Sequence, residues 1–309
     1  MRLQLSVPVS LLQPKEYVEQ LGTAPTSVSE QDALAYTRWL ATHHYENFQV
    51  VSFLLPRHLH QEFYNVYAFC RWADDLGDEI GDPRESLRLL AWWRSELEAM
   101  YRGEAAHPVF VALRGTVERF EIPIDPFDRL IRAFEQDQTV SRYSNFDEVL
   151  AYCVNSANPV GHLVLYLCGY RDAARQQLSD YTCSALQLAN FWQDVTVDLL
   201  KGRIYLPLDL LARHGYTEDD LAAQRFDQRF AALMKEAVNV AEDLFHKGLP
   251  LVAIVDRRLA LDLELFSRGG LAILRKIRDR GYNVLERRPS ISKVERVAIL
   301  LRCLPRLMF

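Results

Sequence analysis

The sequence predicts an all-α fold, with ten or more helices around one central cavity. Apolar residues recur at helical spacing through most of the 309 residues, and the alternating patterns typical of strands are almost absent. No linker rich in glycine, serine or proline divides the chain, and no internal repeat is visible. No proline occurs between Pro159 and Pro207, a span long enough for two long, mostly buried helices. We therefore expect an irregular arm over residues 1–26 and a single domain over residues 27–309.

The individual helices are expected from capping signals, prolines and apolar spacing. Ser27-Val-Ser-Glu30 fits a capping box, and the first helix is expected over residues 33–48. Pro83 suits the first turn of a helix that runs to about Tyr101. Helical spacing also covers the segments 58–80, 107–120, 126–137, 146–170, 174–200, 226–248, 250–281 and 290–304.

Composition limits the class of protein. The chain is 49% hydrophobic and 25% charged, and its formal net charge of −5 gives no argument for a nucleic-acid partner. Its five cysteines are widely spaced and form no Cys-x-x-Cys pair, which favours free thiols in a reducing compartment. The first ten residues make a poor signal peptide, and no stretch of 18 apolar residues occurs. We therefore expect a cytoplasmic protein.

A first acidic cluster reads Arg71-Trp-Ala-Asp74-Asp75-Leu-Gly-Asp78-Glu79. Asp74 and Asp78 lie four residues apart and therefore share a helix face with Arg71. Asp75 and Glu79 form a neighbouring pair, which we expect to turn toward solvent or the rim of the cavity. Taken alone, the cluster fits a solvated acidic helix end equally well.

A second cluster lies in an apolar stretch. Asn190, Asp194 and Asp198 follow one another at intervals of four, with Gln187 one turn earlier, so they line one face of the helix predicted over 174–200. Leucine, phenylalanine, tryptophan and valine surround them, and carboxylates are costly to bury in such company unless a positive charge meets them. A polar stripe on a surface helix is the weaker alternative.

Two such helices facing each other would place four carboxylates around a small volume. Oxygen ligands suit Mg²⁺, which often binds through carboxylates together with substrate phosphates. Neutralising a diphosphate makes it a good leaving group, and an apolar cavity would suit a hydrocarbon. A carboxylate-bridged di-iron bundle requires two Glu-x-x-His motifs, whereas this sequence offers only the approximate Asp243-Leu-Phe-His246.

From about residue 36 to residue 300, these motifs resemble the squalene/phytoene synthases, head-to-head prenyltransferases with an all-α isoprenoid synthase fold. The resemblance rests on His44-Tyr-Glu-Asn47-Phe48, Leu54-Leu-Pro56, Tyr67-Ala-Phe-Cys-Arg71 with Asp74-Asp-Leu-Gly-Asp78, and Gln187-Leu-Ala-Asn190 followed by Asp194, Asp198 and Gly202-Arg203-Ile-Tyr205-Leu-Pro207. The paired aspartate motifs, in this order and with this tail, are highly specific.

Within the family, the details most resemble the hydroxysqualene synthases of bacterial hopanoid biosynthesis. Gln193 stands where most relatives carry arginine, and Val197 where they carry glutamate. Asn155-Ser-Ala-Asn-Pro-Val-Gly replaces a Val-Ala-Gly-x-Val-Gly motif that usually follows an aromatic residue. The Arg287-Arg-Pro tail also fits.

The resemblance implies an enzyme that ionises presqualene diphosphate and captures the rearranged carbocation with water, giving hydroxysqualene without NADPH. One alternative is a transferase that condenses two farnesyl diphosphates to presqualene diphosphate, squalene or dehydrosqualene. A non-catalytic helical assembly factor is a third, and the intact aspartates argue against it.

The same resemblance implies the roles of individual residues. The residues expected to hold Mg²⁺ are Asp74, Asp78, Asn190, Asp194 and Asp198. Substrate contacts are expected from His44, Asn47, Phe48, Arg71, Gln187, Asn190, Arg203 and Tyr205. Tyr67 and Tyr205 would donate hydrogen bonds to the leaving group. Asn155, Ser156 and Asn158 would position the water, or form a polar kink ahead of Pro159; the two interpretations carry equal weight.

The C-terminal segment is basic. Residues 268–309 contain eleven Lys and Arg against three acids, a net charge of +8. Its amphipathic end could contact an anionic bilayer at the inner face of the cytoplasmic membrane. A packed final helix with an exposed basic face is the alternative, and contacts with enzymes of the same pathway stay open.

Overall fold

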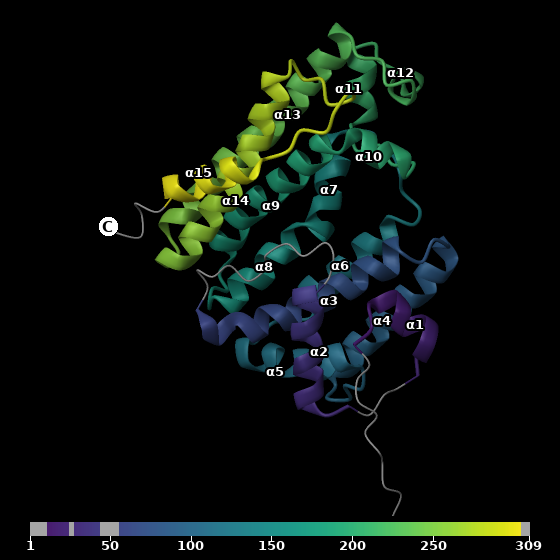
Figure 1. Ribbon diagram of the computed structural model, residues 1–309, viewed down its shortest axis with the longest axis vertical. Coiled ribbons are helices and arrows are strands. Elements are labelled where there is room, and N and C mark those ends of the chain that lie inside the picture. The colour runs from purple at the N-terminus through teal and green to yellow at the C-terminus, as the bar shows by residue number, and fades with distance from the viewer. Residues whose placement is uncertain (1–10, 25–27, 44–55, 304–309) are drawn as a thin grey trace, which may run out of the picture. The chain divides into compact units, whose positions relative to one another are not determined.

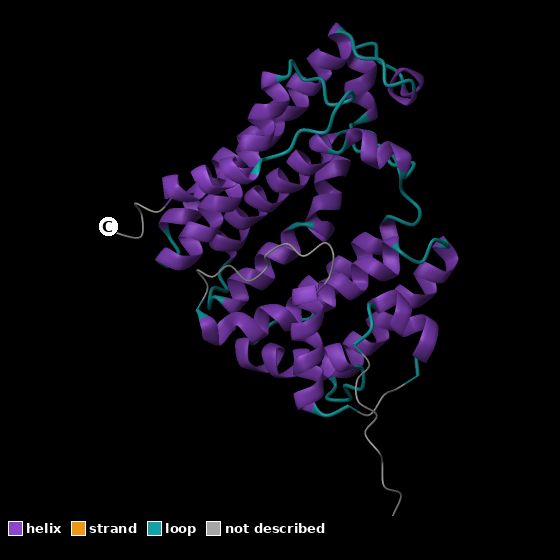
Figure 2. Cartoon of the chain, in the orientation of Figure 1, coloured by secondary structure: helices purple, strands orange, loops and turns teal. Residues whose placement is uncertain are grey.

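Helices make up the regular structure of the protein. The computed structural model describes residues 11–24, 28–43 and 56–303. Within these ranges, extended segments pair only at an isolated parallel bridge between Arg142 and Ile204, and Figure 2 accordingly shows helices joined by loops. The prediction of an all-α fold is confirmed. None of the helices in these ranges has the length and apolar character that a membrane span needs.

The chain divides into two compact units, one formed by residues 1–139 and 162–170 and the other by residues 140–161 and 171–309. The first contains α1 (Pro14–Leu21), α2 (Glu30–His43), η1 (Arg57–Leu59), α3 (His60–Asp78), α4 (Pro83–Tyr101), α5 (Pro108–Phe120) and α6 (Asp125–Gln136) (Figure 1). The second contains α7 (Phe146–Ser156), α9 (Ala173–Gln193), α10 (Val195–Leu200), α11 (Leu208–Arg213), α12 (Glu218–Ala222), α13 (Gln228–Gly248), η2 (Leu249–Ala253), α14 (Arg257–Asp279) and α15 (Lys293–Cys303). The helix α8 (Asn158–Leu167) contributes residues to both units. The expected single domain and its cavity stay predictions.

Helix starts follow the local sequence. Pro83 opens α4, as predicted, because its fixed φ suits the first turn and its missing N–H is not needed there. The side chain of Asp82 caps this helix by accepting a hydrogen bond from the Arg84 N–H at 2.9 Å. At α2, the Ser29 hydroxyl accepts a hydrogen bond from the Asp32 N–H at 3.2 Å. Ser27 and residues 44–48, which belong to the predicted capping box and first helix, lie outside the described residues.

Some predicted boundaries are wrong. The arm was expected to be irregular, but Pro14–Leu21 form α1, which ends at Gly22 with a φ of 68°. The helix predicted over 146–170 breaks at Ala157 into α7 and α8. The helix predicted over 250–281 is interrupted before Asp256, which caps α14 by accepting hydrogen bonds from two backbone N–H groups.

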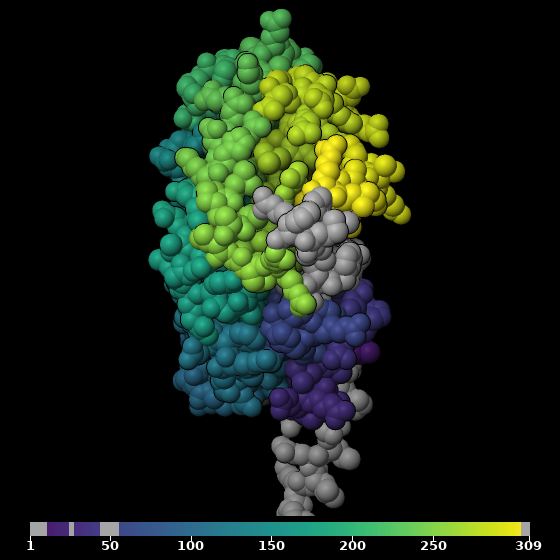
Figure 3. All heavy atoms as spheres, turned by 90° about the vertical axis from the view of Figure 1, so that its left-hand side faces the viewer, coloured from purple at the N-terminus to yellow at the C-terminus, as the bar shows by residue number. Residues whose placement is uncertain are grey.

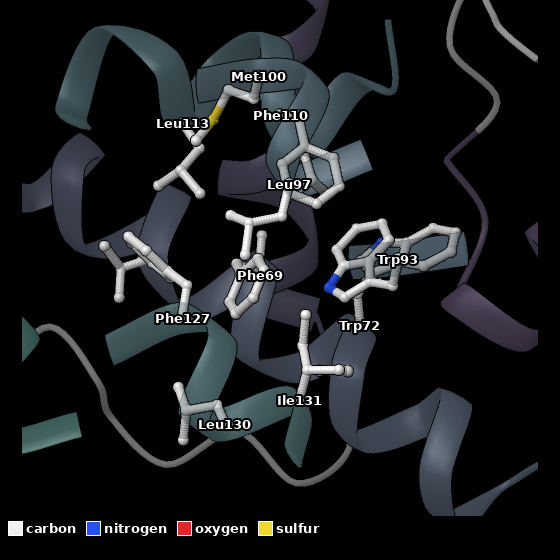
Figure 4. Close-up of a cluster of buried hydrophobic side chains, with 14 of the residues drawn as sticks. Phe69, Trp72, Trp93, Leu97, Met100, Phe110, Leu113, Phe127, Leu130 and Ile131 are labelled. Carbon is white, nitrogen blue, oxygen red and sulfur yellow. The ribbon is translucent and has the colours of Figure 1, made fainter. Parts of the chain in front are cut away.

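An aromatic core holds α3 in the first unit. The Trp72 and Trp93 rings stack with centroids 4.9 Å apart and planes 8° from parallel, and Phe69 meets Phe127 edge-on at 4.8 Å (Figure 4). The His107 ring lies edge-on to Trp72 at 4.4 Å, and burial lowers the pKa of His107 to about 3. This packing fixes the axial rotation of α3, and therefore which of its acids are buried.

Close helix packing organises the second unit. A Cβ atom added at Gly248 of α13 would lie 2.2 Å from Oγ1 of Thr182 and 2.9 Å from its backbone nitrogen. Only glycine therefore allows α13 to approach α9 this closely. A Cβ atom at Gly270 of α14 would likewise lie 2.2 Å from Cζ of the buried Phe245. Figure 3 shows α15, in yellow, at the surface.

Candidate active site

The first group of candidate residues lies in the last turns of α3. Arg71 donates hydrogen bonds from Nη1 to Oδ2 of Asp74 at 2.5 Å and to Oδ1 of Asp75 at 3.4 Å. Asp74 is about one-third exposed and Asp78 is exposed. The structure therefore brings Arg71, Asp74 and Asp78 to the same end of α3, as the helical spacing predicted. We call Arg71, Asp74, Asp75 and Asp78 the α3 group.

Asp75 corrects the prediction for this cluster. We expected it to turn toward solvent or a cavity rim, but it is only 4% exposed. Burial raises the pKa of Asp75 to about 7, although the nearby Arg71 opposes that rise. The reason is the rotation of α3, since Trp72 and Leu76, which flank Asp75 on the helix, are fully buried in the aromatic core. The α3 group therefore contains one sequestered acid beside two accessible ones.

Tyr67 lies one turn before Arg71 on α3. The guanidinium carbon of Arg71 is 5.9 Å from the centroid of the Tyr67 ring, within the range of a cation–π contact. Burial raises the pKa of Tyr67, and Arg71 opposes this effect. The phenol therefore stays protonated and can act as a hydrogen-bond donor next to the α3 group.

The second group lies where α9 gives way to α10. We predicted one helix over 174–200, but Asp194 interrupts it with φ −106° and ψ 17°. The backbone spacing nevertheless persists across the interruption. The Asp194 N–H donates to the Asn190 carbonyl, and the Asp198 N–H donates to the Asp194 carbonyl, both at 2.9 Å. Asn190 is exposed, Gln187 is half-buried, and we call Asn190, Asp194 and Asp198 the junction group.

Arg288 joins the junction group and was missed in the sequence. Its Nη2 donates to Oδ2 of Asp194 at 3.0 Å, and its Nε donates to Oδ1 of the same carboxylate. These hydrogen bonds raise the pKa of Arg288. The two residues are 94 positions apart, so no helical spacing relates them. The available signal was the Arg287-Arg-Pro motif, to which we had assigned no role.

The chain reverses after α10 and brings Arg203 back toward the junction. Gly202 has a φ of 75°, which favours glycine, and the Arg203 N–H donates to the Asp198 carbonyl at 2.9 Å. The Ile204 N–H then donates to the Ser141 carbonyl at 2.9 Å. This turn forms a small pocket, whose lining residues are Phe191, Val195, Asp198, Arg203, Ile204, Tyr205, Leu206 and Leu221.

Tyr205 forms one wall of that pocket. Its ring stacks on Phe191 with centroids 3.7 Å apart and planes 6° from parallel. The stacking leaves the ring 7% exposed and fixes its position relative to Arg203. The structure therefore brings the predicted residues Asp198, Arg203 and Tyr205 together.

The asparagines near Pro159 have different environments. Asn158 is 5% exposed, and its Oδ1 accepts a hydrogen bond from the Ser184 hydroxyl at 2.9 Å. It starts α8 directly after the break at Ala157, which agrees with the polar-kink interpretation. Asn155 lies in α7 and is partly exposed. Of the two, Asn155 is the better placed to meet a water molecule.

The two groups belong to different units. Tyr67 and the α3 group lie in the first unit. The second unit contains the junction group together with Asn155, Gln187, Arg203 and Tyr205. That both groups act on one substrate stays a prediction. His44, Asn47 and Phe48 lie outside the described residues.

The donor atoms of both groups fit magnesium. They are carboxylate and amide oxygens, the ligand type that Mg²⁺ prefers. Among the described residues, no three His, Cys, Asp or Glu side chains form a ready-made metal cluster. Mg²⁺ commonly binds through one or two carboxylates, with water and substrate phosphates as the other ligands. The side chains present therefore suit a metal that arrives with a phosphorylated ligand.

Similarity to known proteins is consistent across sequence and structure. Residues 41–295 match the sequence profile described as squalene/phytoene synthase. The phytoene synthase of Thermus thermophilus is 34% identical over 272 residues, which cover 88% of this chain and 92% of that protein. The squalene synthase HpnC from Alicyclobacillus acidocaldarius has a TM-score of 0.79 and 44% identity, covering 85% of this chain and 98% of that one. A dehydrosqualene synthase gives a TM-score of 0.80 over 90% of this chain and 98% of its own, and its 24% identity shows a shared fold alone.

Proposed function

Because the chain belongs to the squalene/phytoene synthase family, whose members process isoprenoid diphosphates, we propose that it converts presqualene diphosphate to hydroxysqualene. One observation carries the proposal: each predicted aspartate motif presents a carboxylate paired with an arginine, Arg71 with Asp74 and Arg288 with Asp194. Arginines beside acids of this kind suit a metal–diphosphate ligand. The 44% identity to a squalene synthase supports a product of this size and class.

The reaction is a hydrolytic substitution that needs no reductant. The carbon–oxygen bond to the diphosphate breaks, and its electron pair leaves with the diphosphate oxygen. The resulting cyclopropylcarbinyl cation rearranges, water adds its oxygen to the cation, and one proton is released. The sum is presqualene diphosphate plus water giving hydroxysqualene plus diphosphate.

The chain's own residues bind and orient the leaving group. Arg71 and Arg203 pair with phosphate oxygens, since each guanidinium can contact two of them. Tyr67 and Tyr205 donate hydrogen bonds to the departing diphosphate. Asp74, Asp78, Asn190, Asp194 and Asp198 are the residues that would hold magnesium, which when bound supplies neutralisation of the diphosphate charge.

Asn155 is proposed to orient the attacking water. Asn158 already accepts a hydrogen bond from the Ser184 hydroxyl, whereas Asn155 is partly exposed. Replacing Asn155 by Leu should shift products from the alcohol toward hydrocarbons, as measured by gas chromatography and mass spectrometry. Replacing Asn158 by Leu should mainly lower stability. An unchanged hydroxysqualene yield in the Asn155→Leu variant would remove this role.

The runner-up function is the condensation of two farnesyl diphosphates. It is favoured by the phytoene synthases among the relatives. Incubating the protein with farnesyl diphosphate and, separately, with presqualene diphosphate, each with Mg²⁺ and without NADPH, distinguishes the two. We expect hydroxysqualene in the incubation with presqualene diphosphate and no product in the incubation with farnesyl diphosphate. Products from farnesyl diphosphate would establish condensation, and no product from either would overturn both.

A peripheral membrane contact through α15 is part of the proposal. Val294, Val297 and Leu301 recur at helical spacing and are 78%, 55% and 59% exposed. The neighbouring Lys293 and Arg296 are also exposed, so the apolar stripe has a basic border. Sedimentation with vesicles of phosphatidylglycerol and phosphatidylcholine should retain the protein, and changing Val294, Val297 and Leu301 to Ser should release it. Equal binding by both forms would discard the contact.

A further inference from the structure

The segment that carries Arg288 is anchored on both sides. Val284 and Leu285 are 1% and 5% exposed, and Pro289 is buried. The buried Gln193 side chain donates a hydrogen bond from Nε2 to the Pro289 carbonyl at 2.7 Å. Arg288 therefore stands between two fixed points of the backbone, directly beside the α9–α10 junction.

A further contact restrains the chain just before Arg288. Arg280 donates from Nη1 to the carbonyl of Arg287 at 2.8 Å. With the backbone held at residues 287 and 289, little backbone freedom is lost when the Arg288 side chain reaches Asp194. Because aspartate is short, Arg288 is the one long side chain that must be ordered, whereas an ordinary surface ion pair often orders two.

The ion pair engages both oxygens of the Asp194 carboxylate. Both carboxylate oxygens accept hydrogen bonds from Arg288, and the Asp194 side chain is only 13% exposed. A bidentate guanidinium–carboxylate pair is among the stronger polar contacts, especially when the acid is mostly withdrawn from water. A cation that is to bind Asp194 therefore competes with the guanidinium for the carboxylate.

We propose that Arg288 is an internal counter-ion, which occupies Asp194 in the ligand-free enzyme and leaves it only when a diphosphate anion arrives with a divalent cation. This rests on the proposed function, in which Asp194 is a metal ligand. The Arg288 side chain is about half exposed, so its guanidinium can turn from the carboxylate to phosphate oxygens, which it binds with the same bidentate geometry. Arg288 is thus a positioning residue that couples metal binding to diphosphate binding.

The coupling has a thermodynamic consequence. If diphosphate releases Asp194 for the cation, the cation strengthens diphosphate binding by the same factor, because binding linkage is reciprocal. Without diphosphate, the junction group should bind a divalent cation poorly. Removing the guanidinium should strengthen metal binding on its own and weaken its dependence on diphosphate.

The test measures Mn²⁺ binding through the electron paramagnetic resonance signal of free Mn²⁺, with and without inorganic diphosphate, against a protein-free titration. We expect Arg288→Gln to bind Mn²⁺ about tenfold more tightly than the unmodified protein in the absence of diphosphate, a difference of about 1.4 kcal/mol. Arg288→Lys keeps the charge but loses the bidentate contact, and should lie between the two. Arg287→Gln, at the adjacent exposed arginine, should match the unmodified protein.

Two further variants test whether the additional Mn²⁺ binds at Asp194. The gain in Arg288→Gln should disappear in the double variant with Asp194→Asn, which would assign the added Mn²⁺ to Asp194. Equal Mn²⁺ affinity in Arg288→Gln and the unmodified protein would overturn the proposed role of Arg288 as a counter-ion. If Asp194→Asn then still weakened Mn²⁺ binding in the presence of diphosphate, Asp194 would remain a metal ligand and the proposed site would stand. If it had no effect there, the proposed site would fail as well.

Discussion

The α3 group and the junction group both pair an aspartate with an arginine, but they assemble the pair differently. In the α3 group, Arg71 lies three residues before Asp74, so the helix itself brings them together. In the junction group, Arg288 reaches Asp194 from 94 residues away. The first pair therefore forms wherever α3 forms, whereas the second forms only after α14 and the following segment have packed.

The groups also differ in how they treat their acids. Asp75 is buried among the aromatic residues of the first unit, with a raised pKa. In the junction group, Asp194 and Asp198 are both of intermediate exposure, and Asp194 is covered by the guanidinium of Arg288. The α3 group therefore carries a pH-dependent component through Asp75.

The largest expected effect tests whether the two groups are equally necessary. Asp74→Asn and Asp194→Asn should each lower kcat/KM by about 100-fold or more, because the amide lacks the negative charge with which the carboxylate attracts the divalent cation, and the diphosphate charge is then less compensated. Steady-state product formation over a range of Mg²⁺ concentrations measures this, with circular dichroism as the check on folding. Asp243→Asn, at an exposed acid of α13, is the matched control. Undiminished activity in either variant would remove that group from the site.

The next effect is a pH dependence of stability, which tests the burial of Asp75. The folded pKa of Asp75, about 7, lies above its ordinary value of 3.8, so between these pH values the folded protein binds more protons than the unfolded chain. Rising pH should therefore lower the free energy of unfolding across this window, by on the order of 4 kcal/mol from Asp75. Asp75→Asn should lose this slope. Urea unfolding at several pH values measures it.

A matched variant controls for the loss of an acid. Asp78→Asn removes an exposed carboxyl from the same helix and should keep the pH slope of the unmodified protein. Equal slopes for Asp75→Asn and the unmodified protein would mean that Asp75 titrates as an ordinary surface acid.

The smallest effect tests how closely α14 packs against Phe245 of α13 in the second unit. Gly270→Ala would place a Cβ atom 2.2 Å from Cζ of the buried Phe245, and should lower the free energy of unfolding by about 1–3 kcal/mol. Gly269→Ala meets no atom within 4 Å and should raise it by about 1 kcal/mol, because alanine favours the helix. Urea unfolding compares the two variants. Equal stability of Gly270→Ala and Gly269→Ala would contradict the close packing at Gly270.

The sequence alone determined the all-α fold, the positions of most helices and the residues of both aspartate motifs. These are properties of short range: apolar spacing, proline and capping side chains act within a few residues of themselves. The spacing also placed Arg71 beside Asp74 correctly. It did not locate the one-residue interruption at Asp194, because the pattern on either side continues. It offered a kink ahead of Pro159, where the helix breaks at Ala157, only as one of two interpretations of equal weight.

Tertiary structure alone decided which acid is sequestered and which arginine meets Asp194. Asp74 and Asp75 are adjacent in sequence, and only the aromatic packing around Trp72 determines that Asp75 is the buried one. Gln193 and Arg288 stood out in the sequence only as part of a family resemblance, and the structure relates them through Pro289. Contacts across some ninety residues depend on how helices pack, and that depends on shape complementarity over the whole unit, which no local pattern contains.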